Sequence, residues 1–347
     1  MRILWVKSSS LGDIIHSFPA ISDALAANAQ IRVDWVVEEH FTDVLKLYRE
    51  PIEPIPVALR RWRRHLFARN TWKEFKHFRK TIQTKPYDLV IDAQGLVKSA
   101  CLLLGIKSLK LGMNAASCRE PLAAYAYNKT FTVARNQHAV MRTRELMAKA
   151  LDYPLPTSAP DYAIKLQDST PNVATHPYIV FIHGSSWPEK AWPLTHWQNL
   201  AKLLNQQGYK VKLPWGNTTE LHNAQQIAKA GDKIDKGIEV LPKLNLTELA
   251  RVIYESRALV AVDTGLAHLA AAMDKPCVSL YLVTSPLLTG CYGRQQVHLA
   301  VRGQETPHIK KLLAEGIQTP IKPLYLDKVP DYRLVYQHLS ECLSIQI

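Results

Sequence analysis

Residues 258–273 read Ala-Leu-Val-Ala-Val-Asp-Thr-Gly-Leu-Ala-His-Leu-Ala-Ala-Ala-Met. The short apolar run Leu259–Val262 predicts a buried strand. Asp263 and Thr264 are of the types that begin helices, and Gly265 permits a tight turn or the close approach of a ligand. The alanine-rich segment from Leu266 predicts a helix. The stretch therefore predicts a strand, a polar turn and a helix, which is the repeating unit of an α/β fold.

Such a turn aims free backbone N–H groups and the positive end of a helix dipole at one point, where a phosphate binds well. His268, in the first turn of the helix, is expected to face the same point. The alternative is an ordinary strand–helix connection in which Asp263 and Thr264 only cap the helix.

Length and composition narrow the class of protein. The chain has 347 residues, 47% of them hydrophobic, which predicts a globular protein of two domains. Its apolar runs are too short to span a bilayer, and its start has no signal-peptide pattern. Five scattered cysteines without a C-x-x-C pair indicate free thiols in a reducing cytoplasm, and argue against a zinc site or a disulfide framework.

Strands alternate with helices in both halves, which predicts parallel βαβ units with right-handed crossovers. A proline-bearing segment, 152–176, separates the halves. We expect two Rossmann-like domains that face one another across a cleft, over residues 1–165 and 176–325, followed by a terminal helical segment, 326–347.

Positive charge is concentrated in the first half. Lys and Arg outnumber Asp and Glu by 43 to 30, for a formal charge of +13. The segment from Arg60 to Lys85 carries ten Lys or Arg, interleaved with aromatic residues, and Glu74 is its one acidic residue. A nucleic acid, an anionic membrane surface or an anionic substrate would each suit this segment. A solvated helix face is the alternative.

The first predicted strand, Ile3–Val6, ends in a Ser- and Gly-bearing loop that leads to Asp13. The loop has neither the spacing of a P-loop nor G-x-G-x-x-G. It places a carboxylate at the carboxyl end of a strand, where open α/β sheets bind ligands. Asp13 also suits a helix N-cap, and the two roles are compatible.

In the second half, strand Tyr178–His183 leads to Ser185, Ser186 and Lys190. Two hydroxyls and a lysine at the end of a strand suit an anion, although turn chemistry and a surface lysine are the alternatives. Glu220, early in a later helix, is placed to accept hydrogen bonds from ribose hydroxyls. With the 258–273 turn, these residues outline a nucleotide diphosphate site without evident Mg²⁺ ligands.

A carboxylate in one domain and a diphosphate site in the other indicate group transfer. Asp13 would take a proton from an acceptor hydroxyl, while Lys190 stabilises the charge on the departing diphosphate. Cations of the first half would hold an acidic acceptor: Arg60, Arg61, Arg63, Arg64, Lys98, Arg119, Arg142 and Arg144.

These residues resemble those of glycosyltransferase family 9, the ADP-heptose:lipopolysaccharide heptosyltransferases, over nearly the whole chain. The shared motifs are Lys7-x-Ser9-x-Leu11-Gly12-Asp13, Ser185-Ser186-x-x-x-Lys190-x-Trp192-Pro193 and Val262-Asp263-Thr264-Gly265-x-x-His268. The similarity is closer to the branch that adds the first heptose, through 35–39, 60–63, 91–100 and 119–122.

The resemblance implies a GT-B fold in which the first domain binds the acceptor, the second binds ADP-L-glycero-D-manno-heptose, and the C-terminal helix crosses back to pack on the first domain. It implies inverting transfer of heptose to a Kdo residue of Kdo2-lipid A, without a metal or other cofactor, by a peripheral protein at the cytoplasmic face of the inner membrane.

The resemblance also assigns residues. Asp13 matches the catalytic base. The donor site comprises Ser185, Ser186, Lys190, Glu220, Leu244, Asp263, Thr264, Gly265, Leu266 and His268, with Leu244 beside the adenine. The acceptor site comprises Ser9, Arg60, Arg61, Arg63, Arg64, Lys98, Arg119 and Arg142.

The chain departs from the family pattern at two places. Ser185-Ser186 replaces a usual Thr-Thr pair, which keeps the hydroxyls. The loop 282–286 reads Leu-Val-Thr-Ser-Pro where Gly-Pro-Thr-Asp-Pro is usual, so its role at the donor site is left open.

Three other functions compete with this interpretation. A related transferase would use the same donor and a heptose acceptor. A nucleic-acid-binding protein would explain the charge but not the paired α/β halves. A dinucleotide oxidoreductase would explain the fold, but G-x-G-x-x-G is absent after both opening strands.

Overall fold

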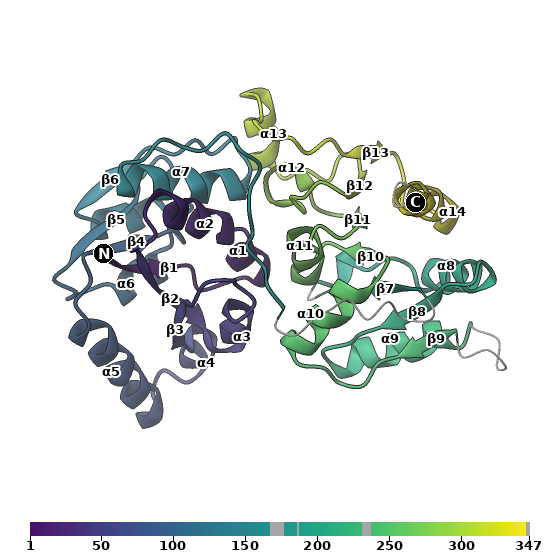
Figure 1. Cartoon of the computed structure of the whole chain (residues 1–347), viewed down its shortest axis with the longest axis horizontal. Coiled ribbons are helices and arrows are strands. Elements are labelled where there is room, and N and C mark those ends of the chain that lie inside the picture. The colour runs from purple at the N-terminus through teal and green to yellow at the C-terminus, as the bar shows by residue number, and fades with distance from the viewer. Residues whose placement is uncertain (167–176, 186, 231–236, 345–347) are drawn as a thin grey trace. The chain divides into compact units, whose positions relative to one another are not determined.

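The computed structural model describes residues 1–166, 177–185, 187–230 and 237–344. The chain divides into two compact units, unit 1 (Met1–Lys165) and unit 2 (Leu166–Ile347). Each unit is an α/β layer structure around its own parallel sheet (Figure 1).

Unit 1 contains a six-stranded sheet in the order β3-β2-β1-β4-β5-β6, with every neighbouring pair parallel. The central strand β1 is apolar from Ile3 to Val6 and fully buried there, as expected where helices cover both faces of a parallel sheet. The strands are β1 (Arg2–Val6), β2 (Arg32–Glu38), β3 (Glu53–Val57), β4 (Leu89–Asp92), β5 (Leu109–Met113) and β6 (Lys129–Phe131).

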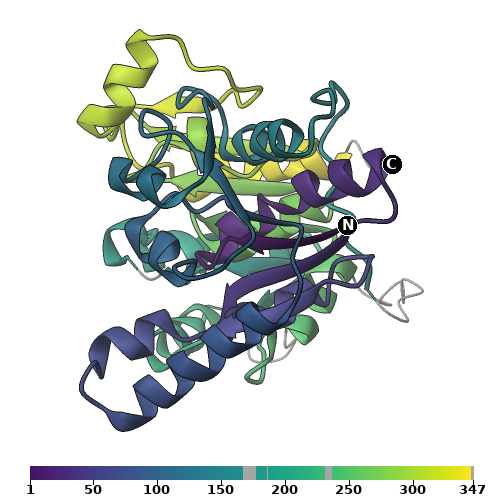
Figure 2. The same cartoon turned by 90° about the vertical axis from the view of Figure 1, so that its left-hand side faces the viewer.

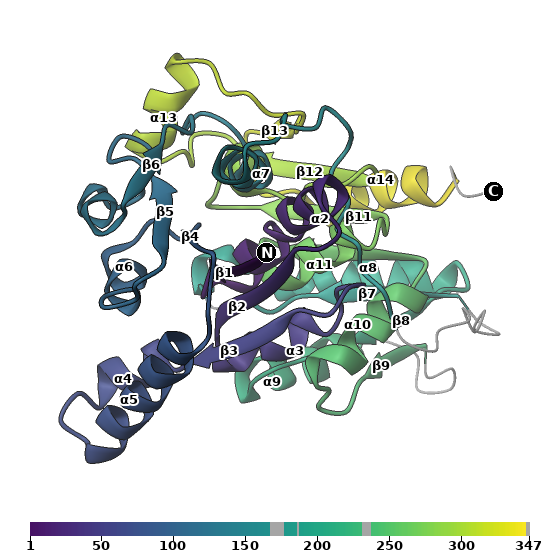
Figure 3. The same cartoon turned by 60° about the vertical axis from the view of Figure 1, so that its left-hand side comes forward.

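The helices of unit 1 are α1 (Leu11–Ile15), α2 (Phe18–Ala27), η1 (Glu39–Phe41), α3 (Thr42–Leu45), α4 (Leu59–Arg64), α5 (Arg69–Thr84), α6 (Val97–Leu102), η2 (Pro121–Ala126) and α7 (Ala139–Leu151). Helices α2 and α7 pack side by side (Figures 1 and 3). A buried ion pair joins them, with Arg144 Nε 2.6 Å from Asp23 Oδ2. Arg144 is therefore a structural cation, and the expectation that it binds an acidic acceptor is wrong.

Two features of unit 1 are not indicated by the sequence pattern. Residues 14–25 form the ends of two helices and not one continuous helix: Ser17 is the N-cap of the second, α2, because Pro19 in its first turn has no N–H for a preceding turn. Helix α4 was not predicted. With α5 it forms a helical hairpin beside β3, which Figure 2 shows in blue.

Unit 2 contains a seven-stranded parallel sheet in the order β13-β12-β11-β10-β7-β8-β9. The sequence pattern did not predict β12 and β13, because Gln296 and His298 interrupt the apolar run of β12 and β13 has only three residues. The strands are β7 (Tyr178–Ile182), β8 (Lys210–Leu213), β9 (Ile238–Val240), β10 (Ala258–Val262), β11 (Cys277–Tyr281), β12 (Gln296–Val301) and β13 (Leu324–Leu326).

The helices of unit 2 are η3 (Pro188–Lys190), α8 (Leu194–Gln206), α9 (Thr218–Ala228), α10 (Leu246–Glu255), α11 (Gly265–Ala272), α12 (Pro286–Thr289), α13 (Pro307–Ala314) and α14 (Tyr332–Ser344). The stretch 258–273 folds as expected: β10 is wholly buried, Thr264 is the N-cap and α11 follows. Apolar side chains of α8 and of β7, β10 and β11 share one core.

The terminal helix α14 was expected to pack on the first domain. In the structure its apolar face packs in unit 2, against α8, β10 and β11. Val335, Leu339 and Leu343 recur every four residues, so they form one stripe, and all three are buried in the core of unit 2. Trp192 Nε1 also donates to Pro330 O at 2.8 Å, just before this helix.

All five cysteines are free thiols, as their spacing predicts. In the described part of the chain no helix is both long and apolar enough to cross a membrane.

Candidate functional site

Each sheet has one point where successive strands diverge to opposite sides. In unit 1, β1 pairs with both β2 and β4, and in unit 2, β7 pairs with both β8 and β10. The loops at the carboxyl ends of β1 and β4, and of β7 and β10, therefore leave their sheets side by side. Ligands of open α/β sheets bind at such switch points. Among the predicted catalytic and diphosphate-binding residues, Asp13 follows β1, Ser185 and Lys190 follow β7, and Thr264 and Gly265 follow β10.

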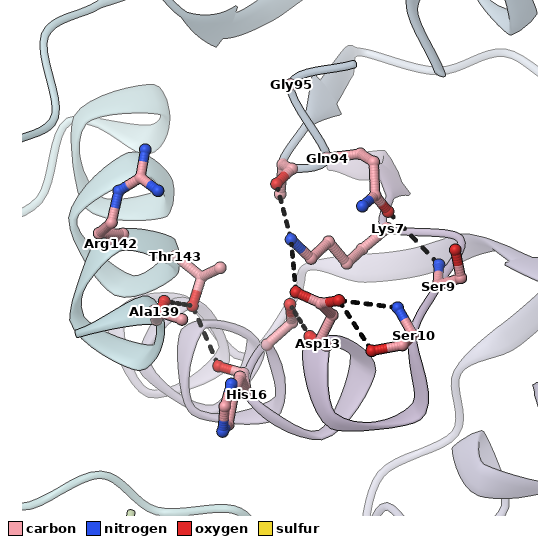
Figure 4. Close-up of polar contacts among 12 residues, drawn as sticks. Lys7, Ser9, Ser10, Asp13, His16, Gln94, Gly95, Ala139, Arg142 and Thr143 are labelled. Carbon is pink, nitrogen blue, oxygen red and sulfur yellow. Dashed lines mark hydrogen bonds and ion pairs between the residues drawn. The ribbon is translucent and has the colours of Figure 1, made fainter. Parts of the chain in front are cut away.

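Asp13 is fixed by the loop after β1 (Figure 4). The N–H and Oγ of Ser10 donate to Asp13 Oδ2 at 2.7 and 3.0 Å. Ser10 is therefore the N-cap of α1, and Asp13, three residues on, completes a capping box instead of being the cap itself. Lys7 Nζ lies 3.4 Å from Asp13 Oδ1. These contacts orient the Asp13 carboxylate. Its side chain is 36% exposed, so it is also accessible to a ligand.

These contacts set the charge of Asp13. Desolvation acts to raise its pKa, but the charge of Lys7 and the hydrogen bonds from Ser10 outweigh it and hold the pKa below the ordinary value of an aspartate. Asp13 is thus an anion throughout the neutral range. A carboxylate in this state can accept a proton.

The loop after β4 supports the loop after β1. Lys7 Nζ donates to Ala93 O at 3.2 Å, and Ser8 N–H donates to Gln94 Oε1 at 2.9 Å. Asp92 holds this second loop from beneath. It is fully buried, and it accepts hydrogen bonds from the N–H groups of residues 94 and 95, from the Ser99 hydroxyl and from the Tyr127 hydroxyl. Burial raises the pKa of Asp92. The sequence motif around Asp92 did not indicate that it supports the Lys7–Asp13 pair.

The structure sorts the predicted acceptor-binding cations of α4. Arg61 is occupied: its guanidinium lies 3.0 Å from Glu39 Oε2 and 2.9 Å from Glu74 Oε2. Arg60 lies over the ring of Phe41. Arg63 and Arg64 are exposed, and no carboxylate pairs with either in the described ranges. Arg60, Arg63 and Arg64 are therefore the cations of this helix that are exposed and lack a carboxylate ion pair within the described ranges.

Of the other acceptor candidates, Ser9 and Arg119 lie in loops and Lys98 lies in the first turn of α6. Ser9 is half-buried, and its N–H donates to Gln94 Oε1 at 3.4 Å. Lys98 and Arg119 are exposed on two segments that Glu120 joins, because its carboxylate accepts from Val97 N–H at 2.7 Å.

Arg142, on α7, is a largely buried cation. It donates to Ser117 O at 2.6 Å, while its Nε has no hydrogen-bond partner in the described part of the chain. Burial lowers its pKa, and nearby Arg135 adds to the effect. A buried guanidinium without a carboxylate is costly unless an anion joins it. Arg142 is therefore suited to an acidic ligand.

In unit 2 the loops after β7 and β10 meet through an ion pair. Lys190 Nζ lies 2.6 Å from Asp263 Oδ2, with both side chains largely buried. Thr284 Oγ1 donates to the same oxygen at 2.9 Å. Thr284 belongs to the divergent loop 282–286, so this loop orients Asp263 through a hydroxyl that the sequence pattern did not single out.

Glu220 lies in the first turn of α9, which follows β8. Its carboxylate accepts from Gly216 N–H at 2.7 Å and from the Asn217 amide at 2.9 Å. A Cβ at Gly184 would lie 2.4 Å from Glu220 Cδ, so the glutamate covers the backbone of the loop after β7. Position 184 must be glycine for Glu220 to hold this orientation.

Other donor-site candidates surround the same edge. Thr264 caps α11 with its backbone, and no side chain caps the helix in the described part of the chain, so the first N–H groups, at Gly265 and Leu266, have no capping side chain. His268 is buried on the first turn. Ser185 Oγ accepts from Trp187 N–H at 3.3 Å. Leu244 is half-buried just after β9. Ser186 lies outside the described residues.

Among the described residues, no group of three or more His, Cys, Asp or Glu side chains is arranged to hold a metal ion. The expected independence of the reaction from metal stays a prediction.

The chain is similar in sequence to known heptosyltransferases. The model of glycosyltransferase family 9 (heptosyltransferase) matches residues 75–317. Lipopolysaccharide heptosyltransferase 1 of Pseudomonas aeruginosa is 46% identical over 318 residues, which cover 90% of this chain and 87% of that protein.

Two solved structures are also similar. The Escherichia coli heptosyltransferase WaaC with ADP has a TM-score of 0.82 at 42% identity, covering 91% of this chain and 99% of that one. The same enzyme with ADP-2-deoxy-2-fluoro heptose has a TM-score of 0.80, with the same identity and coverage.

Two parallel α/β units and the similarity to the heptosyltransferase structures show that the protein is a glycosyltransferase of GT-B fold. Within that class, the chain belongs to glycosyltransferase family 9, the heptosyltransferases.

We predict that Lys7→Met raises the pKa of Asp13, because the cation that favours its ionised form is removed. Carboxyl-carbon NMR titration measures this pKa, and Asp13→Asn identifies the resonance. An unchanged titration would show that the Ser10 hydrogen bonds alone set the charge of Asp13.

We predict that Gly184→Ala lowers the free energy of unfolding by no more than about 1 kcal/mol, roughly the net worth of a hydrogen bond, because the new Cβ displaces the end of the flexible Glu220 side chain from Gly216 and Asn217. In a Glu220→Ala background the same change should cost much less. Urea unfolding of the four proteins of this cycle measures the coupling. Equal costs in both backgrounds would contradict the contact.

Proposed function

We propose that this protein transfers L-glycero-D-manno-heptose from ADP-L-glycero-D-manno-heptose to a Kdo residue of Kdo2-lipid A, with inversion and without a metal. The observation that carries the proposal is the oriented, ionised and accessible carboxylate of Asp13 in unit 1. The Lys190–Asp263 pair of unit 2 supports a donor site there, and a similar enzyme was solved with an ADP-heptose analogue.

The donor side is supported by the chemistry of unit 2. Lys190 uses one of its three ammonium hydrogens on Asp263 and keeps two for phosphate oxygens. The N-terminus of α11, which no side chain caps in the described ranges, offers backbone N–H groups and a partial positive charge to the same anion. Glu220 can accept hydrogen bonds from ribose hydroxyls. The relative solved with an ADP-heptose analogue makes an ADP-sugar the fitting donor.

The acceptor side is supported by cations at the carboxyl edge of unit 1. Arg142 lacks a carboxylate partner in the described part of the chain, and Arg63, Arg64, Lys98 and Arg119 are exposed. Kdo carries a carboxylate and lipid A carries phosphates, and both kinds of anion would form charge-assisted hydrogen bonds with these cations. Anionic lipid around the acceptor would attract the same surface, which supports a peripheral place at the cytoplasmic face of the inner membrane. Nucleic acid is not proposed as a partner.

In the proposed reaction, Asp13 takes the proton of an acceptor hydroxyl as the oxygen attacks the anomeric carbon of the heptose. The new C–O bond forms as the bond from that carbon to the diphosphate breaks. The electron pair leaves with ADP, whose growing negative charge Lys190 and the N-terminus of α11 stabilise. Attack opposite the leaving group inverts the anomeric configuration.

A second candidate is transfer to a heptose acceptor, because curated heptosyltransferases of the second step are also similar over about half of the chain. The test incubates the protein with ADP-heptose and either Kdo2-lipid A or its heptosylated form, with and without chelator. A mass gain of one heptose on Kdo2-lipid A, unaffected by chelator, is expected. Gain only on the heptosylated form would establish the second candidate, and loss with chelator would overturn metal independence.

We predict that Asp13→Asn lowers kcat by roughly 10²- to 10⁴-fold, the usual contribution of a general base, while ADP affinity is unchanged. The amide is isosteric and keeps one oxygen to accept from Ser10, so folding should survive. Steady-state kinetics and calorimetric titration with ADP separate the two effects. Lys190→Ala is the complementary variant and should weaken ADP binding. A normal kcat for Asp13→Asn would remove Asp13 as the base.

We predict that Arg63→Gln with Arg64→Gln raises KM for a water-soluble, deacylated Kdo acceptor severalfold without changing the melting temperature. The matched control is Arg61→Gln, which breaks two ion pairs and should lower the melting temperature instead. An unchanged KM in the double variant would assign these two arginines to a solvated face.

A further inference from the structure

The hairpin of α4 and α5 ends in an exposed apolar tip. Between the helices, Phe67 is 99% exposed and Leu66 is 53% exposed, and Trp72 on the first turns of α5 is 54% exposed. Large apolar side chains gathered on one exposed feature mark an interaction surface more often than an accident of packing. Figures 1 and 3 show the two helices extending beyond the sheet of unit 1.

The tip is held in shape by the hairpin itself. Trp62 is buried against Phe75 and Phe78 at centroid distances of 5.8 and 6.2 Å. Trp72 Nε1 donates to Leu66 O at 2.9 Å, and Thr71 Oγ1 donates to His65 O at 2.8 Å. Two carbonyl groups of the connection are thus satisfied from within the hairpin, which lowers the cost of moving it out of water.

The exposed charged residues around the tip are positive. The exposed residues Arg63, Arg64, Arg69, Lys73 and Lys76 surround it. The acidic residue of the segment, Glu74, is already bound by Arg61 and by Trp62 Nε1 at 2.7 Å. In the described part of the chain no ion pair involves the surrounding cations. Apolar side chains next to exposed cations suit an anionic bilayer, whose charged headgroups lie outside its acyl chains.

We propose that the tip, Leu66 and Phe67 with the adjacent Trp72, inserts into the interfacial layer of an anionic bilayer while the surrounding cations bind lipid headgroups. The inference rests on the proposed function in one respect, since a lipid-linked acceptor lies in such a bilayer. Electrostatic attraction brings the hairpin to the surface, and insertion of the apolar side chains makes the attachment resistant to salt.

The test compares three proteins: the wild type, Leu66→Ser with Phe67→Ser, and the control Leu104→Ser. Leu104 is 54% exposed, matches Leu66 in exposure and lies outside the hairpin. Each is sedimented with vesicles of equimolar phosphatidylglycerol and phosphatidylcholine, and with vesicles of phosphatidylcholine alone, at low and high salt. Each is also assayed with deacylated acceptor and with Kdo2-lipid A embedded in the anionic vesicles.

We expect the double variant to lose about tenfold or more in partition onto anionic vesicles, from the loss of two buried apolar side chains, with the largest loss at high salt. It should keep its activity on the deacylated acceptor and lose activity on the embedded one. Leu104→Ser should match the wild type in every assay, and vesicles of phosphatidylcholine alone should bind all three weakly.

Equal partition of the double variant and the wild type would overturn the inference, as would equal binding to neutral and anionic vesicles. The inference would also be overturned if the wild type formed an oligomer in the absence of vesicles and the double variant were monomeric. The tip would then bind a second copy of the chain and not a bilayer. Tip-dependent binding without heptose transfer to either acceptor would support the inference and overturn the proposed function.

Discussion

Parallel pairing of one central strand with neighbours on both sides is the constraint on which each unit depends. Strand β1 pairs with β2 on one edge and with β4 on the other. The chain therefore adds β2 and β3 on one side of β1, and then returns to add β4, β5 and β6 on the opposite side. The loops at the two carboxyl ends are left side by side, without a helix between them. The same holds for β7, with β8 and β10. Residues distant in sequence, such as Lys190 and Asp263, then lie within 2.6 Å.

Within unit 1 the buried carboxylate of Asp92 helps to position the candidate base, Asp13. Asp92 accepts four hydrogen bonds, from residues 94, 95 and 99 and from Tyr127, and these anchor the loop after β4. That loop positions Lys7 through Ala93 O and the β1 loop through Gln94. The charge of Asp13 thus depends on a carboxylate that does not touch it. Four of these hydrogen bonds involve a backbone group, and a hydrogen bond fixes direction as well as distance. The last link, from Lys7 to Asp13, is an ion pair between side chains.

Local pattern was enough to predict the alternation of strands and helices, the turn after β10 and the presence of polar groups at the strand ends. It was not enough to sort charges. Arg61 and Arg144 are bound by Glu39, Glu74 and Asp23, whereas Arg63 and Arg64 are exposed, and all four look alike in sequence. The difference is made by partners up to 121 residues away. The role of Thr284 and the packing of α14 depend on tertiary contacts in the same way.

The Lys190–Asp263 pair shows how such contacts shape chemistry. A largely buried ion pair gains little net stability, because desolvation of both charges offsets their attraction. Its value lies in holding a cation at a fixed place, and Thr284 strengthens that hold by donating to the same carboxylate oxygen. In the proposed reaction, the charge of the departing diphosphate grows beside an ammonium group that is already oriented. Little reorganisation is then needed at the moment of bond breaking, which is how preorganised charges lower a barrier. The loop 282–286 supplies the Thr284 hydroxyl that this arrangement uses.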